Sequence, residues 1–285
     1  MLGFIGTIRF LLLCGCIVAS DRTTYVASQS EPVDLELVLA VDTSGSMDGA
    51  KLQMQREGYE NAFRDKEFMQ AVKSGPTGRI AVVYLEWAGV GYQNVLVPWT
   101  LIERPEDALN FAEALAAQPF THPPHERAGT SISGGLLSAM GLFANANSAA
   151  ARRVVDISGD GTNNSGFAII PVRDSLVARG ITINGLPIAV ESNQPFGYWE
   201  PGPEQLKAYF DHCVIGGPSS FALVVSKVDQ FDAILRRKLL TEIVASNARV
   251  VPVSASTAQV NFDCSAPGEQ SGQQWKRQMP GAVNQ

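Results

Sequence analysis

Three short polar segments of this sequence carry side chains that bind hard metal ions. The first reads Asp42-Thr43-Ser44-Gly45-Ser46, the second contains Thr130 after Gly129, and the third contains Asp160 before Gly161. Carboxylate and hydroxyl oxygens are hard donors of the kind that Mg²⁺ prefers, and they serve nitrogen- or sulfur-preferring metals poorly. If the fold brings these segments together, we expect one divalent-cation site.

The three segments lie where predicted strands and helices meet. Asp42 directly follows the apolar stretch 33–41, Thr130 opens a small apolar helical stretch at 130–145, and Asp160 follows the apolar stretch 153–158. In an open, mostly parallel sheet, binding sites form in the loops beyond the carboxyl ends of the strands. The placement of the segments therefore agrees with a shared site.

The rest of the sequence alternates strand-like and helix-like stretches. The patterns predict strands at 33–41, 79–87, 94–101, 153–158, 181–190 and 222–226, and helices at 51–72, 105–117, 130–145, 166–179, 204–212 and 229–245. A short loop with Gly89 and Gly91 suits a hairpin between two of the strands, which makes one edge strand antiparallel. The alternation predicts the α/β class: a three-layer α/β/α, Rossmann-like domain around a mostly parallel sheet.

These segments resemble the metal-ion-dependent adhesion site of von Willebrand factor type A domains, which combines a D-x-S-x-S loop with a distant threonine and a distant aspartate. The resemblance spans residues 33–245. The sequence is also similar to an exported bacterial branch of that superfamily, described only as a domain of unknown function, in stretches such as Val97-Pro98-Trp99-Thr100 and Ile215-Gly216-Gly217-Pro218. The resemblance implies the von Willebrand factor type A fold.

Each polar residue of the predicted site can be given a role. We expect Ser44 and Ser46 to bind the cation directly, Thr130 to bind directly or through water, and Asp42 and Asp160 to bind through water or orient the other ligands. Mg²⁺ is the expected ion, and Mn²⁺ or Ca²⁺ would also suit these donors. Such a set leaves one position open, which an Asp or Glu of a protein partner could fill.

Two alternatives concern the same residues. Asp42 and Ser46 could simply cap the helix that follows them, as these residue types often do. Asp156 is a second candidate for the third acid, but Asp160 precedes a glycine in a predicted loop. We expect Asp156 to be a strand residue that hydrogen-bonds a neighbouring loop, with a role in orienting the ligands left open.

The ends of the chain indicate export. Residues 1–20 have Arg9 as their only charge and an apolar run of about ten residues, well short of the ~20 needed to cross a bilayer, which is typical of a secretory signal peptide. Leu13-Cys14-Gly15-Cys16 also resembles a bacterial lipoprotein processing site. We expect a periplasmic or secreted protein without a transmembrane span in the mature chain, either soluble or lipid-anchored through Cys16.

Domain boundaries and the remaining cysteines follow from this interpretation. Residues 21–32 read as a linker, 33–247 as the von Willebrand factor type A-like domain, and 248–285 as a low-complexity tail rich in Ser, Gln, Gly and Pro. The mature chain keeps Cys213 and Cys264. They could pair in an oxidising compartment, or Cys213 could be a small buried hydrophobic residue.

Composition narrows the function. The chain has 285 residues, 22 basic and 28 acidic side chains and a net charge of −6, so the basic surface that nucleic-acid binding needs is not expected. It contains no G-x-S-x-G nucleophile motif and no paired-acid arrangement, and we expect a non-enzymatic binding protein. Two other roles stay open: an accessory or chaperone-like subunit of a cell-envelope enzyme system, and a structural domain that the ion merely stabilises. The oligomeric state is left open.

Overall fold

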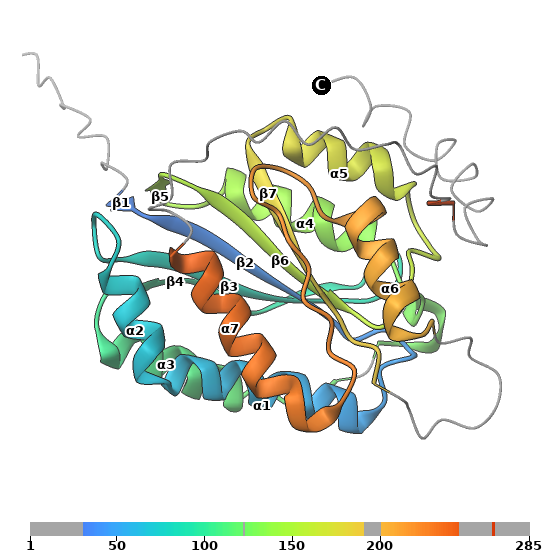
Figure 1. Cartoon of the computed structure of the whole chain (residues 1–285), viewed down its shortest axis with the longest axis horizontal. Coiled ribbons are helices and arrows are strands. Elements are labelled where there is room, and N and C mark those ends of the chain that lie inside the picture. Colours follow the sequence, from blue (N-terminus) through green and yellow to red (C-terminus); the bar gives the residue numbers. More distant parts are fainter. Residues whose placement is uncertain (1–30, 122, 191–200, 245–263, 266–285) are drawn as a thin grey trace, which may run out of the picture.

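A five-stranded sheet forms the centre of the computed structural model, which describes residues 31–121, 123–190, 201–244 and 264–265 (Figure 1). The strand order is β4 (Gln93–Ile102), β3 (Ile80–Trp87), β2 (Leu35–Asp42), β6 (Arg153–Gly159) and β7 (Ile181–Pro187). All neighbours are parallel except β4, which runs antiparallel to β3 at the edge. This confirms the predicted mostly parallel sheet with one antiparallel edge strand.

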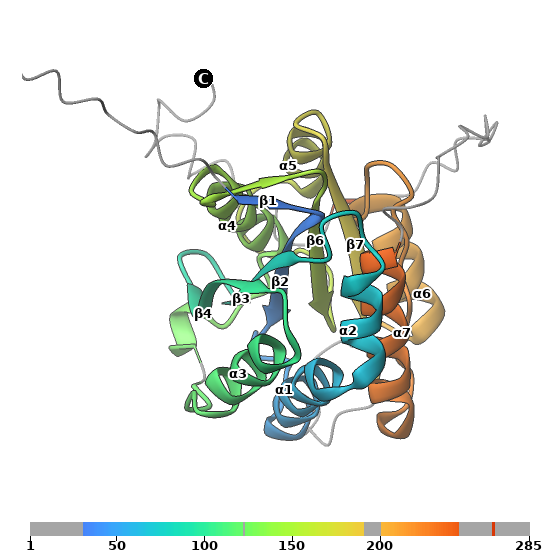
Figure 2. The ribbon, with the colours of Figure 1, turned by 90° about the vertical axis from the view of Figure 1, so that its left-hand side faces the viewer.

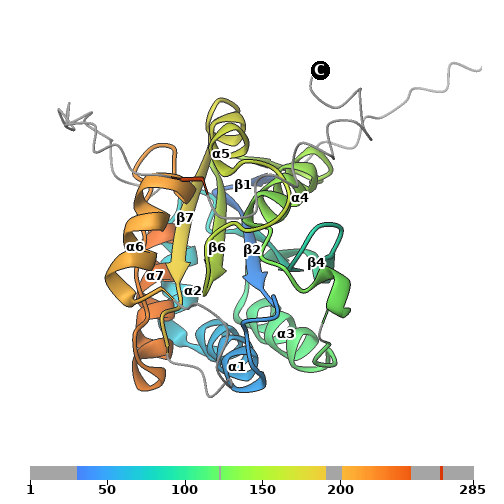
Figure 3. The same ribbon diagram turned by 90° about the vertical axis from the view of Figure 1, so that its right-hand side faces the viewer.

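Helices cover both faces of the sheet, as the views in Figures 2 and 3 show. One layer contains α1 (Gly49–Arg64), α2 (Lys66–Lys73), α3 (Pro105–Ala116) and α7 (Phe231–Val244). The other contains α4 (Ile132–Ala144), α5 (Ile169–Val177) and α6 (Pro203–Tyr209), which continues as a π-helical turn at Phe210–Val214. The fold is the predicted three-layer α/β/α arrangement.

The central strand β2 is buried along its whole length. Leu35, Leu37 and Leu39 pack into the core beneath α1, α2, α3 and α7, and Val38 and Ala40 pack into the core on the α4 side. This alternation follows from the two-residue period of a strand, and burial on both faces is typical of a parallel sheet between helices. The carboxyl end of β2 is thereby held rigidly at the sheet edge where the polar loops lie.

The predicted helix at 51–72 is two helices in the structure. Asp65 has an extended backbone (φ −73°, ψ 133°) that ends α1, and its side chain accepts a hydrogen bond from the Glu67 backbone N–H at 2.8 Å and so caps α2. Arg236 of α7 pairs with the same carboxylate at 2.8 Å. The helical spacing of apolar residues continues across Asp65, so the sequence pattern gave no sign of the break between α1 and α2.

Two further stretches differ from expectation. The predicted strand at 222–226 makes only isolated parallel bridges, Gly185 to Ala222 and Ile188 to Val225, beside β7. The last two residues assigned to the linker, Glu31 and Pro32, instead belong to β1 (Glu31–Val33), which pairs with β5 (Ser148–Ala150). Backbone pairing with a distant segment decides this assignment, and no local pattern in the sequence records it.

A disulfide joins Cys213 to Cys264, with Cα atoms 5.6 Å apart. Of the two alternatives for these cysteines, the structure has the paired one, and Cys213 is also fully buried. The predicted signal peptide 1–20 with Cys16, residues 21–30 of the predicted linker, and the predicted tail apart from residues 264–265 lie outside the described residues. Within the described part of the chain, no helix has the length and apolarity that a membrane span requires.

Candidate metal site

The site lies at the edge of the sheet where β2 and β6 end side by side. Asp42 is the last residue of β2, and Asp160 follows the last residue of β6, its parallel neighbour. The loop after β2 contacts the segment before α4 through a hydrogen bond from the Gly45 N–H to the Ala128 carbonyl, at 2.7 Å. The topology thus brings together the three segments that are far apart in the sequence.

Four of the five predicted ligands form one chain of polar contacts. The Ser44 N–H donates to Asp42 Oδ1 at 2.7 Å, and the Ser44 and Ser46 hydroxyl oxygens are 3.2 Å apart. The Ser46 hydroxyl donates to Asp160 Oδ1 at 2.6 Å. Asp42, Ser44 and Asp160 are buried, whereas Ser46 is partly exposed. The oxygens therefore form a compact cluster with a side open to solvent.

Thr130, the fifth predicted ligand, lies in the second loop, next to the residue that follows Asp160. Its hydroxyl oxygen lies beside Gly161, where a Cβ atom would be 3.7 Å away, and Gly161 directly follows Asp160. Asn164 fixes the backbone of Thr130 by accepting from its N–H at 2.8 Å and donating to its carbonyl at 2.9 Å. The structure thus places all five predicted residues at one sheet edge.

Asp42 carries an uncompensated carboxylate oxygen. Its Oδ2 is buried and has no hydrogen-bond partner among the residues that the structure describes. Burial, with the nearby charge of Asp160, raises the pKa of Asp42 to about 8. An unpaired buried carboxylate is costly unless a cation or a proton compensates it. The donor set therefore fits a hard divalent cation.

Two glycines allow the loops to approach this closely. A Cβ atom at Gly45 would lie 3.1 Å from the Ala128 carbonyl oxygen, and one at Gly159 would lie 3.1 Å from Asp42 Oδ2. The φ of Gly45 is not positive. The close approach of Ala128, rather than an unusual backbone conformation, leaves no room for a side chain at Gly45.

The capping alternative for Asp42 and Ser46 is wrong. The residue that caps α1 is Asp48, whose Oδ1 accepts a hydrogen bond from the Lys51 N–H at 2.8 Å. The carboxylate of Asp42 and the hydroxyl of Ser46 are directed instead to the polar cluster. Their residue types thus serve the site rather than the start of the helix.

Asp156 takes no part in the cluster. It lies on β6, is fully buried, and its Oδ1 is 2.5 Å from Lys238 Nζ of α7. Lys238 also pairs with Glu242 at 2.5 Å, and Glu242 in turn accepts from Asn184 Nδ2 at 2.9 Å. The partner of Asp156 is therefore a helix and not the expected loop. Asp156 shares a face of β6 with Val154, which packs beneath α1, α2, α3 and α7, whereas Asp160 lies in the loop beyond the end of the strand.

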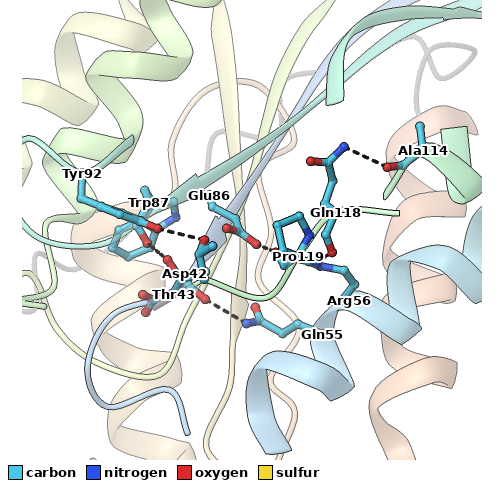
Figure 4. A network of polar contacts seen from close by, with 11 residues as sticks. Asp42, Thr43, Gln55, Arg56, Glu86, Trp87, Tyr92, Ala114, Gln118 and Pro119 are labelled. Atoms are coloured by element: carbon cyan, nitrogen blue, oxygen red, sulfur yellow. Dashed lines mark hydrogen bonds and ion pairs between the residues drawn. The ribbon is translucent and has the colours of Figure 1, made fainter. Parts of the chain in front are cut away.

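Sequence reasoning missed three polar residues of α1 that lie beside the site. Gln55 donates to the Asp42 carbonyl at 2.9 Å and accepts from the Ser158 hydroxyl at 2.8 Å (Figure 4 shows the Gln55 contact to Asp42). One position along, Arg56 binds Glu86 of β3 at 2.6 Å. Residues 55 and 56 lie about two helical turns after the start of α1 at Gly49, and the sequence alone does not fix that start well enough to predict that they face β2.

Lys51 is the third such residue, and it touches a predicted ligand. Its ammonium nitrogen lies 2.9 Å from Asp160 Oδ2, and both side chains are almost completely buried. The lysine sits on the first turn of α1, immediately after the loop that carries Ser44 and Ser46. The cluster therefore contains a cationic side chain as well as oxygen donors.

Comparisons with known proteins agree with this architecture. A model of the family described as "Protein of unknown function (DUF1194)" matches residues 32–247. No curated protein matches the chain. The family description assigns no activity, so the site must be interpreted from its own chemistry.

Several solved structures are similar in fold. Proximal thread matrix protein 1 from the mussel byssus (crystal form 2) is 14% identical with a TM-score of 0.52, covering 74% of this chain and 48% of that one. The pilus adhesin SpaC from Lactobacillus rhamnosus GG is 14% identical with a TM-score of 0.52, covering 75% and 30%. A von Willebrand factor type A protein from Catenulispora acidiphila is 16% identical with a TM-score of 0.50, covering 74% and 43%. This chain spans less than half the length of these proteins, and the similarity shows a von Willebrand factor type A fold.

Proposed function

The chain belongs to the DUF1194 family of proteins of unknown function, and from its site we propose that it binds a divalent cation, Mg²⁺ first, and through it an acidic residue of a protein partner. Ser44, Ser46 and Thr130 supply hydroxyl ligands, and Asp42 and Asp160 supply carboxylates that bind or orient them. One observation carries the proposal: Asp42, Ser44, Ser46 and Asp160 form one chain of hard oxygen donors, and a buried oxygen of Asp42 lacks a partner in the described part of the chain.

The charge of the site favours an acidic partner. Two carboxylates balance a divalent cation, so a bound ion would leave Asp42, Asp160 and the metal without a net charge and able to accept a further carboxylate. The partly exposed Ser46 marks the side from which a partner would approach. The cation would supply Lewis-acid binding of that carboxylate, and the protein residues would hold and orient it.

Related folds support the cation but do not choose its identity. One structure of the mussel thread protein, 14% identical with a TM-score of 0.50, is titled as having a zinc-occupied MIDAS motif. The donors here are all oxygens, which favours Mg²⁺ or Mn²⁺ over Zn²⁺. Ca²⁺ stays a second choice.

The proposal places the protein outside the cytoplasm and assigns it no reaction. The signal-peptide pattern of residues 1–20 supports export, either soluble or anchored through Cys16, and similar folds include a pilus adhesin. Hydrolytic turnover that survives loss of both Ser44 and Ser46 would contradict a purely binding role.

Capture from an envelope extract tests the partner. Immobilised wild-type protein is tested in about 5 mM Mg²⁺, a concentration intended to exceed the Kd of a weak site. It is compared with the same protein in EDTA and with Asp42→Ala. We expect a partner retained only by the wild type with Mg²⁺, and competed off by a peptide rich in Asp and Glu. Equal capture under all three conditions would refute binding through the metal.

A further inference from the structure

Lys51 occupies the position of a second cation at the proposed metal site. Its Nζ lies 2.9 Å from Asp160 Oδ2, while Ser46 donates to the other oxygen of the same carboxylate at 2.6 Å. The lysine and aspartate side chains are 3% and 1% exposed. The ammonium therefore neutralises, out of contact with bulk water, one of the two carboxylates on which a divalent ion depends.

We propose that Lys51 is a tethered cation that competes with the divalent ion for Asp160, so that metal binding displaces it. The inference rests on the proposed function. An ammonium and a divalent cation on one buried carboxylate repel each other, and the repulsion is strong where solvent is excluded. Since only one of the two can be fully compensated by Asp160, the lysine lowers the affinity of the site for metal.

The structure provides room for the displaced side chain. Lys51 and Asp160 both line a cavity of about 520 Å³, whose wall also includes Pro201, Pro203 and Lys227. A lysine carries its charge on a flexible four-carbon stem, so its ammonium can leave Asp160 while the helix stays in place. The exchange thus needs a side-chain rotation and no rearrangement of α1.

The exchange gives Asp160 a cationic partner in both states. Without metal, Lys51 compensates Asp160, and the fold does not depend on an ion. With metal, the ion compensates both carboxylates, and the lysine adds a positive charge to the cavity beside the site. A purely structural lysine would instead hold Asp160 in place for the ion, and its removal would weaken metal binding.

Direct metal titration separates these two roles. Mn²⁺ binding to the full chain is followed by electron paramagnetic resonance of free Mn²⁺, with Mg²⁺ measured by competition, for wild type, Lys51→Met, Lys51→Gln and Lys51→Arg. We expect both neutral variants to bind about tenfold more tightly than wild type, and the arginine variant, which keeps the charge, to stay within twofold of it. Lys73→Met, the same substitution at an exposed position at the end of α2, should bind Mn²⁺ as tightly as the wild type.

The rise in melting temperature on adding Mn²⁺ gives an independent readout of metal binding. Metal-free Lys51→Met is expected to melt below the wild type, because Asp160 loses its partner, and to gain more from saturating Mn²⁺. Unchanged or weaker affinity in both neutral variants, with native near-ultraviolet circular dichroism, would overturn the role of Lys51 alone. Absence of Mn²⁺ binding in the wild type and in every variant would overturn the proposed function together with it.

Discussion

At the scale of single residues, we expect the buried carboxylate of Asp42 to lower the stability of the metal-free fold and to serve cation binding. Asp42 is buried, its Oδ2 lacks a partner in the described part of the chain, and its pKa is raised to about 8 by burial and by Asp160. A carboxylate held in that environment opposes folding in its charged form. The proposed cation, bound after folding, would account for its presence.

Replacing Asp42 by Asn tests directly whether the buried charge lowers stability. The variant keeps the shape and the oxygen that accepts from Ser44, but it removes the buried charge. At pH 8 to 9, where the wild-type carboxyl ionises, we expect the metal-free variant to gain at least about 2 kcal/mol in free energy of unfolding, since each unit of raised pKa corresponds to about 1.4 kcal/mol. Urea denaturation measures the gain, and loss of Mn²⁺ binding should accompany it. A less stable variant would show that the charge is compensated in the fold.

The choice between Asp160 and Asp156 is a second test at this scale. Asp160 contacts Ser46 and Lys51, whereas Asp156 contacts only the buried ion pair with α7. We expect Asp160→Ala to lower Mg²⁺ affinity at least tenfold, and Asp156→Asn to lower stability with Mg²⁺ affinity kept. Titration calorimetry on folded variants decides, and the reverse pattern would remove Asp160 from the site.

At the scale of elements, a buried ionic cluster holds α7 against the sheet. Lys238 Nζ lies 2.5 Å from Glu242 Oε1 on the same helix, α7, and Asp156 of β6 pairs with the same lysine. Burial, with the charge of Asp156, raises the pKa of Glu242 to about 7. Lys238 is fully buried despite its charge.

The pH dependence of stability should report this cluster. Glu242 has a folded pKa near 7 and an ordinary value of about 4.5, so the folded chain retains a proton that the unfolded chain releases between these values. Its contribution to the free energy of unfolding is therefore complete at low pH and falls as pH rises through that window, by at most about 1.4 kcal/mol per pH unit. Glu242→Gln should flatten the slope between pH 5 and 7. Parallel curves for variant and wild type would contradict it.

The elements also show which features the sequence could predict. Strand β2 and the loop after it were predictable, because a continuous apolar run ends at Asp42 and polar residues follow at once. The break at Asp65, the helical partner of Asp156 and the position of Lys51 were not, because each depends on contacts between segments more than forty residues apart or on where a helix begins. Local sequence patterns therefore indicate which residues are candidate ligands, whereas the side chains that contact them depend on tertiary packing.

At the scale of the whole molecule, a disulfide ties the segment around Cys264 to the domain. Cys213 is fully buried at the end of the π-helical turn after α6, and its partner lies 51 residues further along the chain. Closing a loop of that length stabilises a fold by roughly 2–4 kcal/mol through the unfolded state. The bond also fits a protein exported to an oxidising compartment.

Removal of this bond should weaken the domain without disabling the site. We expect Cys213→Ala with Cys264→Ala to lower the melting temperature by roughly 5 to 12 °C, from that free energy and the entropy of a domain of this size. Differential scanning calorimetry with and without reductant measures it, and Mg²⁺ affinity at 20 °C should stay within twofold of the wild type, about 0.4 kcal/mol. An unchanged melting temperature would mean that the bond does not constrain the fold.

Mg²⁺ titration of the purified chain by calorimetry, beside the double variant Ser44→Ala with Ser46→Ala, tests the central claim most directly. The variant removes two hydroxyls from one loop and leaves both carboxylates, Lys51 and the core in place. The account predicts one ion per wild-type chain and at least a hundredfold weaker binding to the variant, roughly 2.7 kcal/mol. Equal binding to both proteins, or none to the wild type, would contradict a metal site built on these loops.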